Sequence, residues 1–180
     1  MTIRRIVTGH NAAGKSVFVS DSEATRNTAF QHVRGFVTSL LWETLPGAKV
    51  PAEAGDPAVA ATSWVPAPGG SNLMFITFPP DSVMGSPDFD PAAAGGEYMA
   101  VLPGLAEKFE MDNPGMHCTD SVDYAVLLEG EIHLELDDGA SRQLAPKDVV
   151  IQNGTRHAWR NKSEKPATML FVLVGAQRKL

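Results

Sequence analysis

The sequence contains one cysteine in 180 residues, so a disulfide within a single chain is impossible. Long apolar runs are also missing: the longest candidate, Met169 to Val174, is far shorter than the roughly 20 residues that a membrane-spanning helix needs. Arg4 and Arg5 near the N-terminus have no apolar segment behind them, which argues against a signal peptide. These absences predict a cytoplasmic protein that does not enter a membrane.

Positive charge is scarce too. Fifteen Lys and Arg residues against 21 Asp and Glu residues give a net charge of −6, which argues against a nucleic-acid partner because such a partner needs a basic surface. Hydrophobic residues make up 43% of the chain, enough for a sizeable core. The length suits a single domain, and we see no internal repeat.

Residues 9–16 match the P-loop pattern G-x4-G-K-S letter for letter. A P-loop needs a helix after it, so that the helix N-terminus can hold a phosphate. Here Val17, Phe18 and Val19 follow, and this β-branched and aromatic run predicts a strand. We therefore interpret the match as a coincidence, and expect a β-hairpin with Asn-Ala-Ala-Gly as its turn.

Short runs of strand-forming residues separated by turn residues make up most of the chain. We expect polar turns at 20–28, loops at 46–57 and 79–96, and a helix only at 97–111, interrupted by Pro103-Gly104. That helical segment could form a lid, although packing on the outside of a barrel is the favoured alternative. Strands are expected at 3–7, 17–21, 36–42, 60–65, 72–78, 124–128, 131–136, 142–144, 148–152, 157–161 and 168–174. Such spacing predicts an all-β sandwich or a closed jelly roll.

Two stretches of the last third carry the candidate chemistry. In the first, from Pro114 to Gly139, the residues His117, Thr119 and Asp123 share odd numbering. An extended chain would therefore place them on one face. In the second stretch, His157 and Trp159 share a face in the same way.

These two stretches resemble the two sequence motifs of the cupin superfamily. The family's first motif reads G-x5-H-x-H-x3-4-E-x6-G, and this chain reads His117-x-Thr119-x3-Asp123-x6-Gly130, with Thr in place of the second His and Asp in place of Glu. The second motif reads G-x5-P-x-G-x2-H-x3-N. This chain keeps Gly154-x2-His157-x3-Asn161 but has Gln152 in the position of the Pro.

The resemblance covers about the last third of the chain and implies a fold. We expect an all-β, cupin-type double-stranded β-helix, which is a jelly-roll barrel, with an N-terminal β-extension and one short helix. Residues 1–112 would form the extension, loops and helix packed on the barrel, and residues 113–180 would carry the core motifs, in one structural domain overall. Small cupins commonly pair by exchanging N-terminal strands, so the resemblance also implies a homodimer.

By the same resemblance, His117, Asp123 and His157 would hold a divalent metal, namely Fe, Mn, Ni or Zn. Thr119 is a poor ligand, and the alternative is a site without metal. In that case the two histidines hydrogen-bond the substrate and Asp123 acts as a general acid or base. We take Asp123 and His157 as candidate catalytic residues, and Thr119, Trp159 and Phe75 as candidate substrate-pocket residues. Cys118 is expected to point outward, His133 to be solvated, and Arg156 and Arg160 to lie on the barrel exterior or at a dimer interface.

Three functional hypotheses follow. The first is an enzyme acting on a small oxygenated or aromatic acid or carbonyl compound inside the barrel, by metal-assisted lyase, isomerase or decarboxylase chemistry. The second is a non-haem Fe(II) dioxygenase or other oxidoreductase. The third is a small-molecule-binding protein without turnover. An enzyme is favoured over a binding module, and one fold hosts many reactions, so the substrate stays open.

Overall fold

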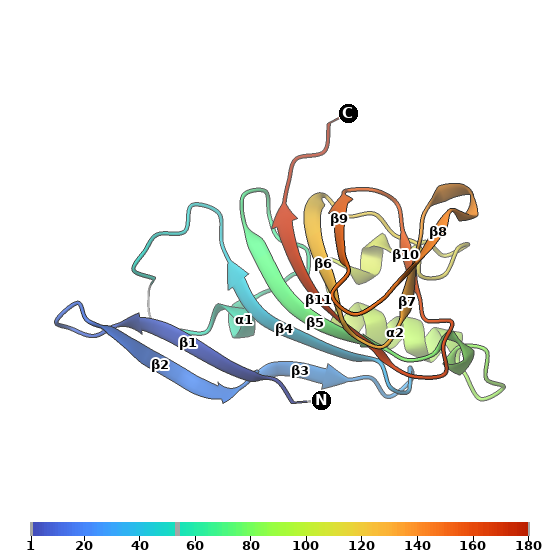
Figure 1. Cartoon of the computed structure of the whole chain (residues 1–180), viewed down its shortest axis with the longest axis horizontal. Helices are drawn as coiled ribbons and strands as arrows, with labels where there is room; N and C mark the ends of the chain where they lie inside the picture. The colour runs from blue at the N-terminus through green and yellow to red at the C-terminus, as the bar shows by residue number, and fades with distance from the viewer. Residues whose placement is uncertain (1, 53–54, 180) are drawn as a thin grey trace.

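The structure, a computed structural model, describes residues 2–52 and 55–179. A six-stranded antiparallel sheet, here called the main sheet, runs through the molecule (Figure 1). In spatial order its strands are β3 (Arg26–Ala29), β4 (Val37–Thr44), β5 (Ser71–Phe78), β11 (Ala167–Gly175), β6 (Ser121–Glu129) and β9 (Val149–Asn153). The predicted all-β cupin-type fold is confirmed.

Two smaller sheets complete the β-structure. One has the order β10 (Ala158–Arg160), β7 (Ile132–Glu135), β8 (Ser141–Leu144), and the other is a hairpin of β1 (Arg4–His10) and β2 (Ser16–Glu23). The helical elements are short: α1 (Pro57–Ala60), η1 (Asp81–Val83), α2 (Pro91–Val101), η2 (Ala106–Lys108) and η3 (Asp137–Gly139). None of the helices in the described ranges has the length and apolar character needed to cross a bilayer.

The core forms on one face of the main sheet, because alternate residues of its strands point to the same side. Met74 and Ile76 of β5, Leu127 of β6 and Met169 of β11 are buried there. Ile132 and Leu144 from the smaller sheet and Leu102 and Leu105 beyond α2 join the same cluster. Each such side chain contributes about 1.5–3 kcal/mol by leaving water.

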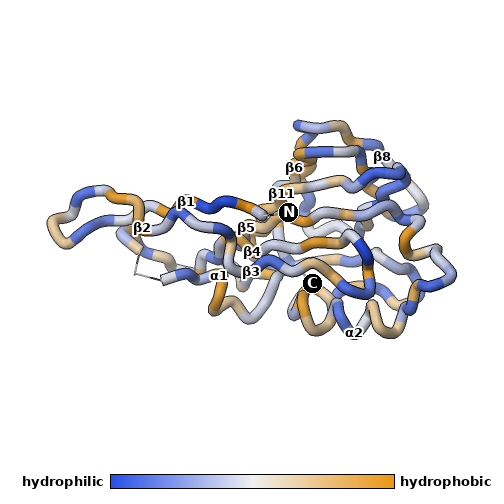
Figure 2. Tube along the Cα trace, turned by 90° about the horizontal axis from the view of Figure 1, so that it is seen from below, coloured by the Kyte–Doolittle hydropathy of each residue, from blue (hydrophilic) through white to orange (hydrophobic). Residues whose placement is uncertain are grey.

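The hairpin of β1 and β2 projects to one side of the molecule, with its turn away from the main body and its base next to α1 and β3 (Figures 1 and 2). Its turn is closed by a bond from the Gly14 amide to the Asn11 carbonyl of 2.9 Å. A strand, not a helix, follows Lys15, so the interpretation of residues 9–16 as a hairpin is confirmed. At its base, Arg5 pairs with Asp56 and donates to the Leu41 carbonyl.

Helix α2 begins earlier than predicted. Asp90 caps its N-terminus by accepting from the amides of Ala92 and Ala93, and Pro91 takes the first helical position. The helix ends at Val101, just before the predicted interruption at Pro103-Gly104, but beyond it the predicted helix is reduced to the 3-10 turn η2. The loop expected at 79–96 was therefore wrong from residue 91 onward, because an Asp-Pro start signal was overlooked.

Two other expectations were wrong. The segment 60–65 is not a strand: α1 ends at Ala60, and Trp64 donates its amide to the Pro103 carbonyl instead of joining a sheet. Residues 20–28 are not a turn, because β2 runs to Glu23 and β3 starts at Arg26. β5, from the part before residue 113, pairs directly with β11, so the N-terminal part supplies strands to the main sheet itself.

Candidate functional site

His117 and His157 lie side by side across an antiparallel bridge. The amide of each donates to the carbonyl of the other at 3.0 Å, and their ring centroids are 4.3 Å apart. Both residues are buried, with 8% and 3% of their surface exposed. The bridge fixes the pair without help from either side chain, since all of its bonds come from the backbone.

The proton positions on both imidazoles follow from their neighbours. Nδ1 of His117 lies 3.0 Å from the Gly115 carbonyl oxygen, and Nδ1 of His157 lies 2.9 Å from that of Thr155. A carbonyl oxygen can only accept, so each Nδ1 carries the proton and donates it. Each Nε2 is then left with a lone pair, able to accept a hydrogen bond or to coordinate a metal.

Burial keeps both rings neutral. It lowers the pKa of His117, against the opposing effects of the Gly115 carbonyl and the Glu110 carboxylate. Burial also lowers the pKa of His157 to about 4, and the neighbouring His117 adds to the effect. Near neutral pH the pair therefore offers two uncharged acceptors.

A closed circuit of eight aromatic and imidazole rings includes the histidine pair, and we call it the aromatic circuit. It draws on the bridge segments, on β10, β11 and β5, and on α2. Burial raises the pKa of Tyr98, so its phenol stays neutral, and the whole circuit is uncharged near neutral pH. In order, the rings are Phe109, His117, His157, Trp159, Phe171, Phe78, Phe36 and Tyr98, with neighbouring centroids 4.3–6.4 Å apart.

Asp123 sits on β6 with only 5% of its surface exposed. Its Oδ1 lies 2.5 Å from Oγ of Ser121, and that Oγ lies 2.9 Å from Oγ1 of Thr119. Burial raises the pKa of Asp123 to about 6, although the hydrogen bonds from Ser121 and Thr119 lower it. Asp123 can therefore hold or release a proton near neutral pH.

The three residues expected to bind a metal are not gathered into a ligand set. Across residues 2–52 and 55–179, no group of three His, Cys, Asp or Glu side chains is arranged to hold a metal ion. The two Nε2 lone pairs suit a metal, but the Asp123 carboxylate is engaged by Ser121. Thr119, in the place of a family histidine, joins the same hydroxyl chain. The donor set as it stands does not fit a three-ligand centre, and metal binding stays a prediction.

The predicted pocket residues divide between two places. Trp159 faces inward, with its ring 5.8 Å from that of His157 and 5.6 Å from that of Phe171. Phe75 does not join it: its cross-strand neighbours are Leu170 and Ser39, and it lies on the face of β5 opposite to the buried Met74 and Ile76. A pocket role for Phe75 therefore has no support in its placement, and β5 proves to be buried fully on one face only.

The two arginines near the second motif form ion pairs with carboxylates of the same chain. Arg156 bonds the carboxylates of Glu110 and Asp137, and Arg160 bonds Glu135. Both arginines are thus satisfied within the chain instead of being free for a partner. His133 is half-buried, where solvation was expected.

Several residues of the site were not identified from the sequence. Ser121 was missed, although a hydroxyl two residues before Asp123 on the same strand face could have signalled it. Phe109 and Tyr98 were assigned only to a helix, and no sequence pattern places them next to His117.

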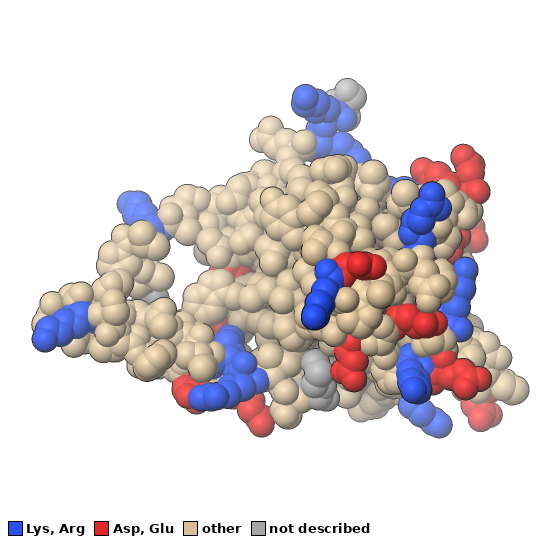
Figure 3. Space-filling model, in the orientation of Figure 1, with Lys and Arg blue, Asp and Glu red and all other residues tan. Residues whose placement is uncertain are grey.

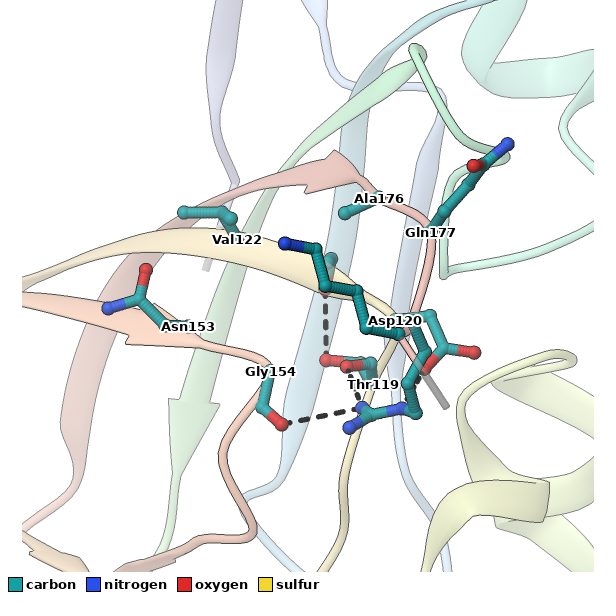
Figure 4. Close-up of a pocket in the computed structure, with 10 residues that line it drawn as sticks. Thr119, Asp120, Val122, Asn153, Gly154, Ala176 and Gln177 are labelled. Carbon is teal, nitrogen blue, oxygen red and sulfur yellow. Dashed lines mark hydrogen bonds and ion pairs between the residues drawn. The ribbon is translucent and has the colours of Figure 1, made fainter.

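A surface pocket of about 300 Å³ lies at the end of β6 and β9, where the segment after β11 forms one wall. Arg178 pairs there with Asp120 and donates to the carbonyls of Thr119 and Gly154 (Figure 4). The same guanidinium lies 2.9 Å from Sγ of Cys118, which itself contacts the Gly154 carbonyl. No ring of the aromatic circuit lines this pocket, so it is separate from the histidine pair.

No protein-family model matches the sequence. Individual relatives do. The chain is 34% identical over 178 residues to phomopsin biosynthesis cluster protein C' of Diaporthe leptostromiformis, covering 98% of this chain and 80% of that protein. It is 51% identical over 63 residues to phomopsin biosynthesis cluster protein D of the same organism, covering 34% of this chain and 33% of that protein. It is 29% identical over 171 residues to the cupin-domain-containing oxidoreductase srdB of Neurospora crassa, covering 94% of this chain and 72% of that protein.

Proposed function

The chain belongs to the cupin superfamily, and we propose that it is an oxidoreductase of a biosynthetic pathway that binds an uncharged, conjugated small molecule against the aromatic circuit. The oxidoreductase class is suggested by the relatives, since cupin-domain proteins named as oxidoreductases occur in Neurospora crassa, Aspergillus ruber and Hypocrea virens. The observation that carries the proposal is the pair of neutral imidazoles set among aromatic rings.

The chemistry of the aromatic circuit favours a neutral ligand. Aromatic side chains stack on flat conjugated systems and bury much apolar area. A carboxylate ligand would need a cationic partner, yet Arg156, next to His157 in the sequence, is already engaged by two carboxylates of this chain. We therefore narrow the expected substrate from aromatic acids to uncharged compounds that carry a hydroxyl or carbonyl group.

The residues support proton transfer. A neutral Nε2 of His117 or His157 accepts a hydrogen bond from a substrate hydroxyl and orients it, while the lowered pKa values of both rings make them weak bases. Asp123, whose pKa is raised to about 6, is the group better able to exchange a proton near neutral pH. Removal of a proton from a hydroxyl, or from a carbon beside a carbonyl, is required in both oxidations and isomerisations, so isomerase or lyase chemistry is the second candidate.

Ligand binding can be tested with Trp159 as the reporter. Uncharged aromatic compounds with a hydroxyl or carbonyl group should quench tryptophan fluorescence, whereas the matched carboxylates should bind at least about 10-fold more weakly, because an unpaired buried charge is costly. Trp159→Phe should remove most of the quenching and keep the binding measured by calorimetry. Equal affinity for acids and neutral compounds would contradict the proposed ligand class.

Turnover separates an enzyme from a binding module. The same compounds are incubated with the protein in air and without oxygen, and products are followed by mass spectrometry. A product two mass units lighter than its substrate, or one that carries added oxygen, supports an oxidoreductase. An isomeric product supports the second candidate, and tight binding with no product in any condition would support a binding protein. Metal content measured on the same preparation, with His117→Ala and His157→Ala as controls, tests the predicted metal.

A further inference from the structure

Gln152 carries a buried hydrogen-bond donor that no other group of the described chain satisfies. The residue lies on β9 with 4% of its surface exposed, where the second cupin motif has a proline. Its Oε1 accepts a hydrogen bond of 3.1 Å from the Thr155 hydroxyl, whereas its Nε2 is buried and has no partner among the described residues. A buried amide donor without an acceptor is costly in free energy, so this group needs an explanation.

The side chain of Gln152 lies on the same face of the main sheet as Asp123. The two residues are paired across β9 and β6, and residues paired across strands point to the same side of a sheet, with Cβ atoms about 5 Å apart. Thr155 connects the amide to the histidine pair, because its hydroxyl donates to Gln152 and its carbonyl oxygen accepts from Nδ1 of His157 at 2.9 Å. The unpaired donor is therefore next to the candidate site.

The register of the main sheet relates this amide to the aromatic circuit. Phe171 of the circuit pairs with Ala125, which lies on β6 two residues after Asp123 and on the same face. Two strand spacings of about 4.8 Å and two residues of about 3.4 Å separate Phe171 from Gln152, or roughly 12 Å between their backbones. An aromatic ring that carries one substituent bridges a separation of that size, with a side chain in contact at either end.

The interior offers this donor to a ligand that only accepts. None of the Lys and Arg residues that the structure describes is buried, and Figure 3 shows such side chains projecting from the surface. The imidazoles of His117 and His157 present lone pairs at Nε2, and Asp123 presents carboxyl oxygens. A carbonyl oxygen can only accept a hydrogen bond, so it is Nε2 of Gln152 that suits it among these side chains.

We propose that Nε2 of Gln152 donates a hydrogen bond to a carbonyl oxygen of the substrate, and so selects carbonyl compounds from the uncharged conjugated molecules that bind at the aromatic circuit. The inference rests on the proposed function, because it assigns a residue to the recognition of that ligand. Thr155 is a positioning residue, since its hydroxyl fixes the plane of the amide. A hydrocarbon of the same shape leaves the buried donor unpaired, which disfavours its binding.

Three probes of similar shape test the proposal by calorimetry on the full chain: acetophenone, the alcohol formed by its reduction, and ethylbenzene. Gln152→Met removes the amide and keeps the length of the side chain. It should weaken acetophenone binding about 10-fold, because the carbonyl oxygen loses its donor, and leave ethylbenzene binding within about 2-fold. Thr155→Val keeps the shape of an exposed residue and frees the amide, so it should weaken acetophenone binding by less.

Infrared spectroscopy with a labelled carbonyl carbon gives a readout that a merely structural role for Gln152 would not change. The carbonyl stretch of bound acetophenone should lie at lower frequency than in an apolar solvent, and Gln152→Met should return it toward the apolar value. The matched control is Gln143→Met, at an exposed glutamine of β8, which should leave the binding of every probe within about 2-fold. Circular dichroism checks that each variant is folded.

The outcomes separate this inference from the proposed function. If no probe binds the wild-type chain, the proposed ligand class is wrong and the inference fails with it. If the probes bind but Gln152→Met weakens acetophenone and ethylbenzene equally, or neither, only the inference is overturned. An unshifted carbonyl stretch in the wild-type chain overturns it too, even if Gln152→Met does not fold. A larger loss for the alcohol than for acetophenone would show that the amide oxygen, not Nε2, faces the ligand, and would also overturn it.

Discussion

Replacing Asp123 with Asn tests the electrostatics of the site most directly. In the folded chain burial raises the pKa of the Asp123 carboxyl to about 6, whereas its ordinary value is 3.8. The folded state therefore binds the proton more tightly than the unfolded state does. The stabilisation that this provides is complete below pH 3.8 and is lost as the pH rises through 6.

The magnitude follows from the gap between the two pKa values. Each unit of pKa corresponds to 1.36 kcal/mol, so at pH 7.5 the ionised Asp123 costs about 3 kcal/mol relative to a neutral group of the same shape. At pH 4.5 the cost is about 1 kcal/mol, because most folded molecules are already protonated. Asparagine has that shape and keeps an oxygen for the Ser121 hydroxyl, so Asp123→Asn should stabilise the protein more at pH 7.5 than at pH 4.5.

Urea unfolding at several pH values between 4.5 and 7.5 measures this difference. Asp88→Asn is the control, because Asp88 is exposed and its substitution should leave the free energy of unfolding within about 0.5 kcal/mol at every pH. If Asp123→Asn is destabilising at pH 7.5, or if its effect does not change with pH, then Asp123 is stabilised as a carboxylate and the reasoning fails.

Three further perturbations have expected outcomes. His157→Gln should flatten the loss of stability below pH 6.5 in acid unfolding curves, because burial lowers the pKa of His157 to about 4 and the folded state resists its protonation. Gly130→Ala should cost about 2–4 kcal/mol in urea unfolding, because φ is +84° there and a Cβ would lie 2.5 Å from the Pro166 carbonyl oxygen. Asp90→Ala should cost about 1 kcal/mol by removing the cap of α2, and Asp90→Ser should restore most of it in the same assay.

The sequence predicted best the elements that depend on local features, namely the alternation of apolar side chains along a strand and the residue types of a turn. Alternation at residues 131–136 predicted β7, and the Asp-Asp-Gly turn after it is present as η3. The common parity of His157 and Trp159 predicted that both face inward, which the ring contacts bear out. The residues 60–65 were misassigned because their apolar pattern reflects burial of Trp64 against Pro103, and burial alone does not specify a strand.

The sequence alone did not predict the contacts between segments that lie far apart along the chain. The pairing of His117 with His157 was expected only through the family resemblance, and nothing local indicated Phe109 or Tyr98 as their neighbours. The face on which Phe75 lies depends on the register of β5 against β11, and a shift of one residue would have reversed it. Because β5 carries apolar residues on both faces, its sequence does not indicate which face packs on the core.

The position of β11 in the main sheet has a consequence for how the chain folds. β11 lies between β5 and β6, yet it is the last strand in sequence, and β5 lies about a hundred residues before it. Until residues 167–175 have left the ribosome, the strands β3 to β5 and the strands β6 and β9 have no common neighbour. The nascent chain must therefore keep two apolar half-sheets apart from each other and from other chains, so we expect slow folding after synthesis and a demand for chaperones. Loss of a short C-terminal piece that includes β11 would divide the sheet at its centre.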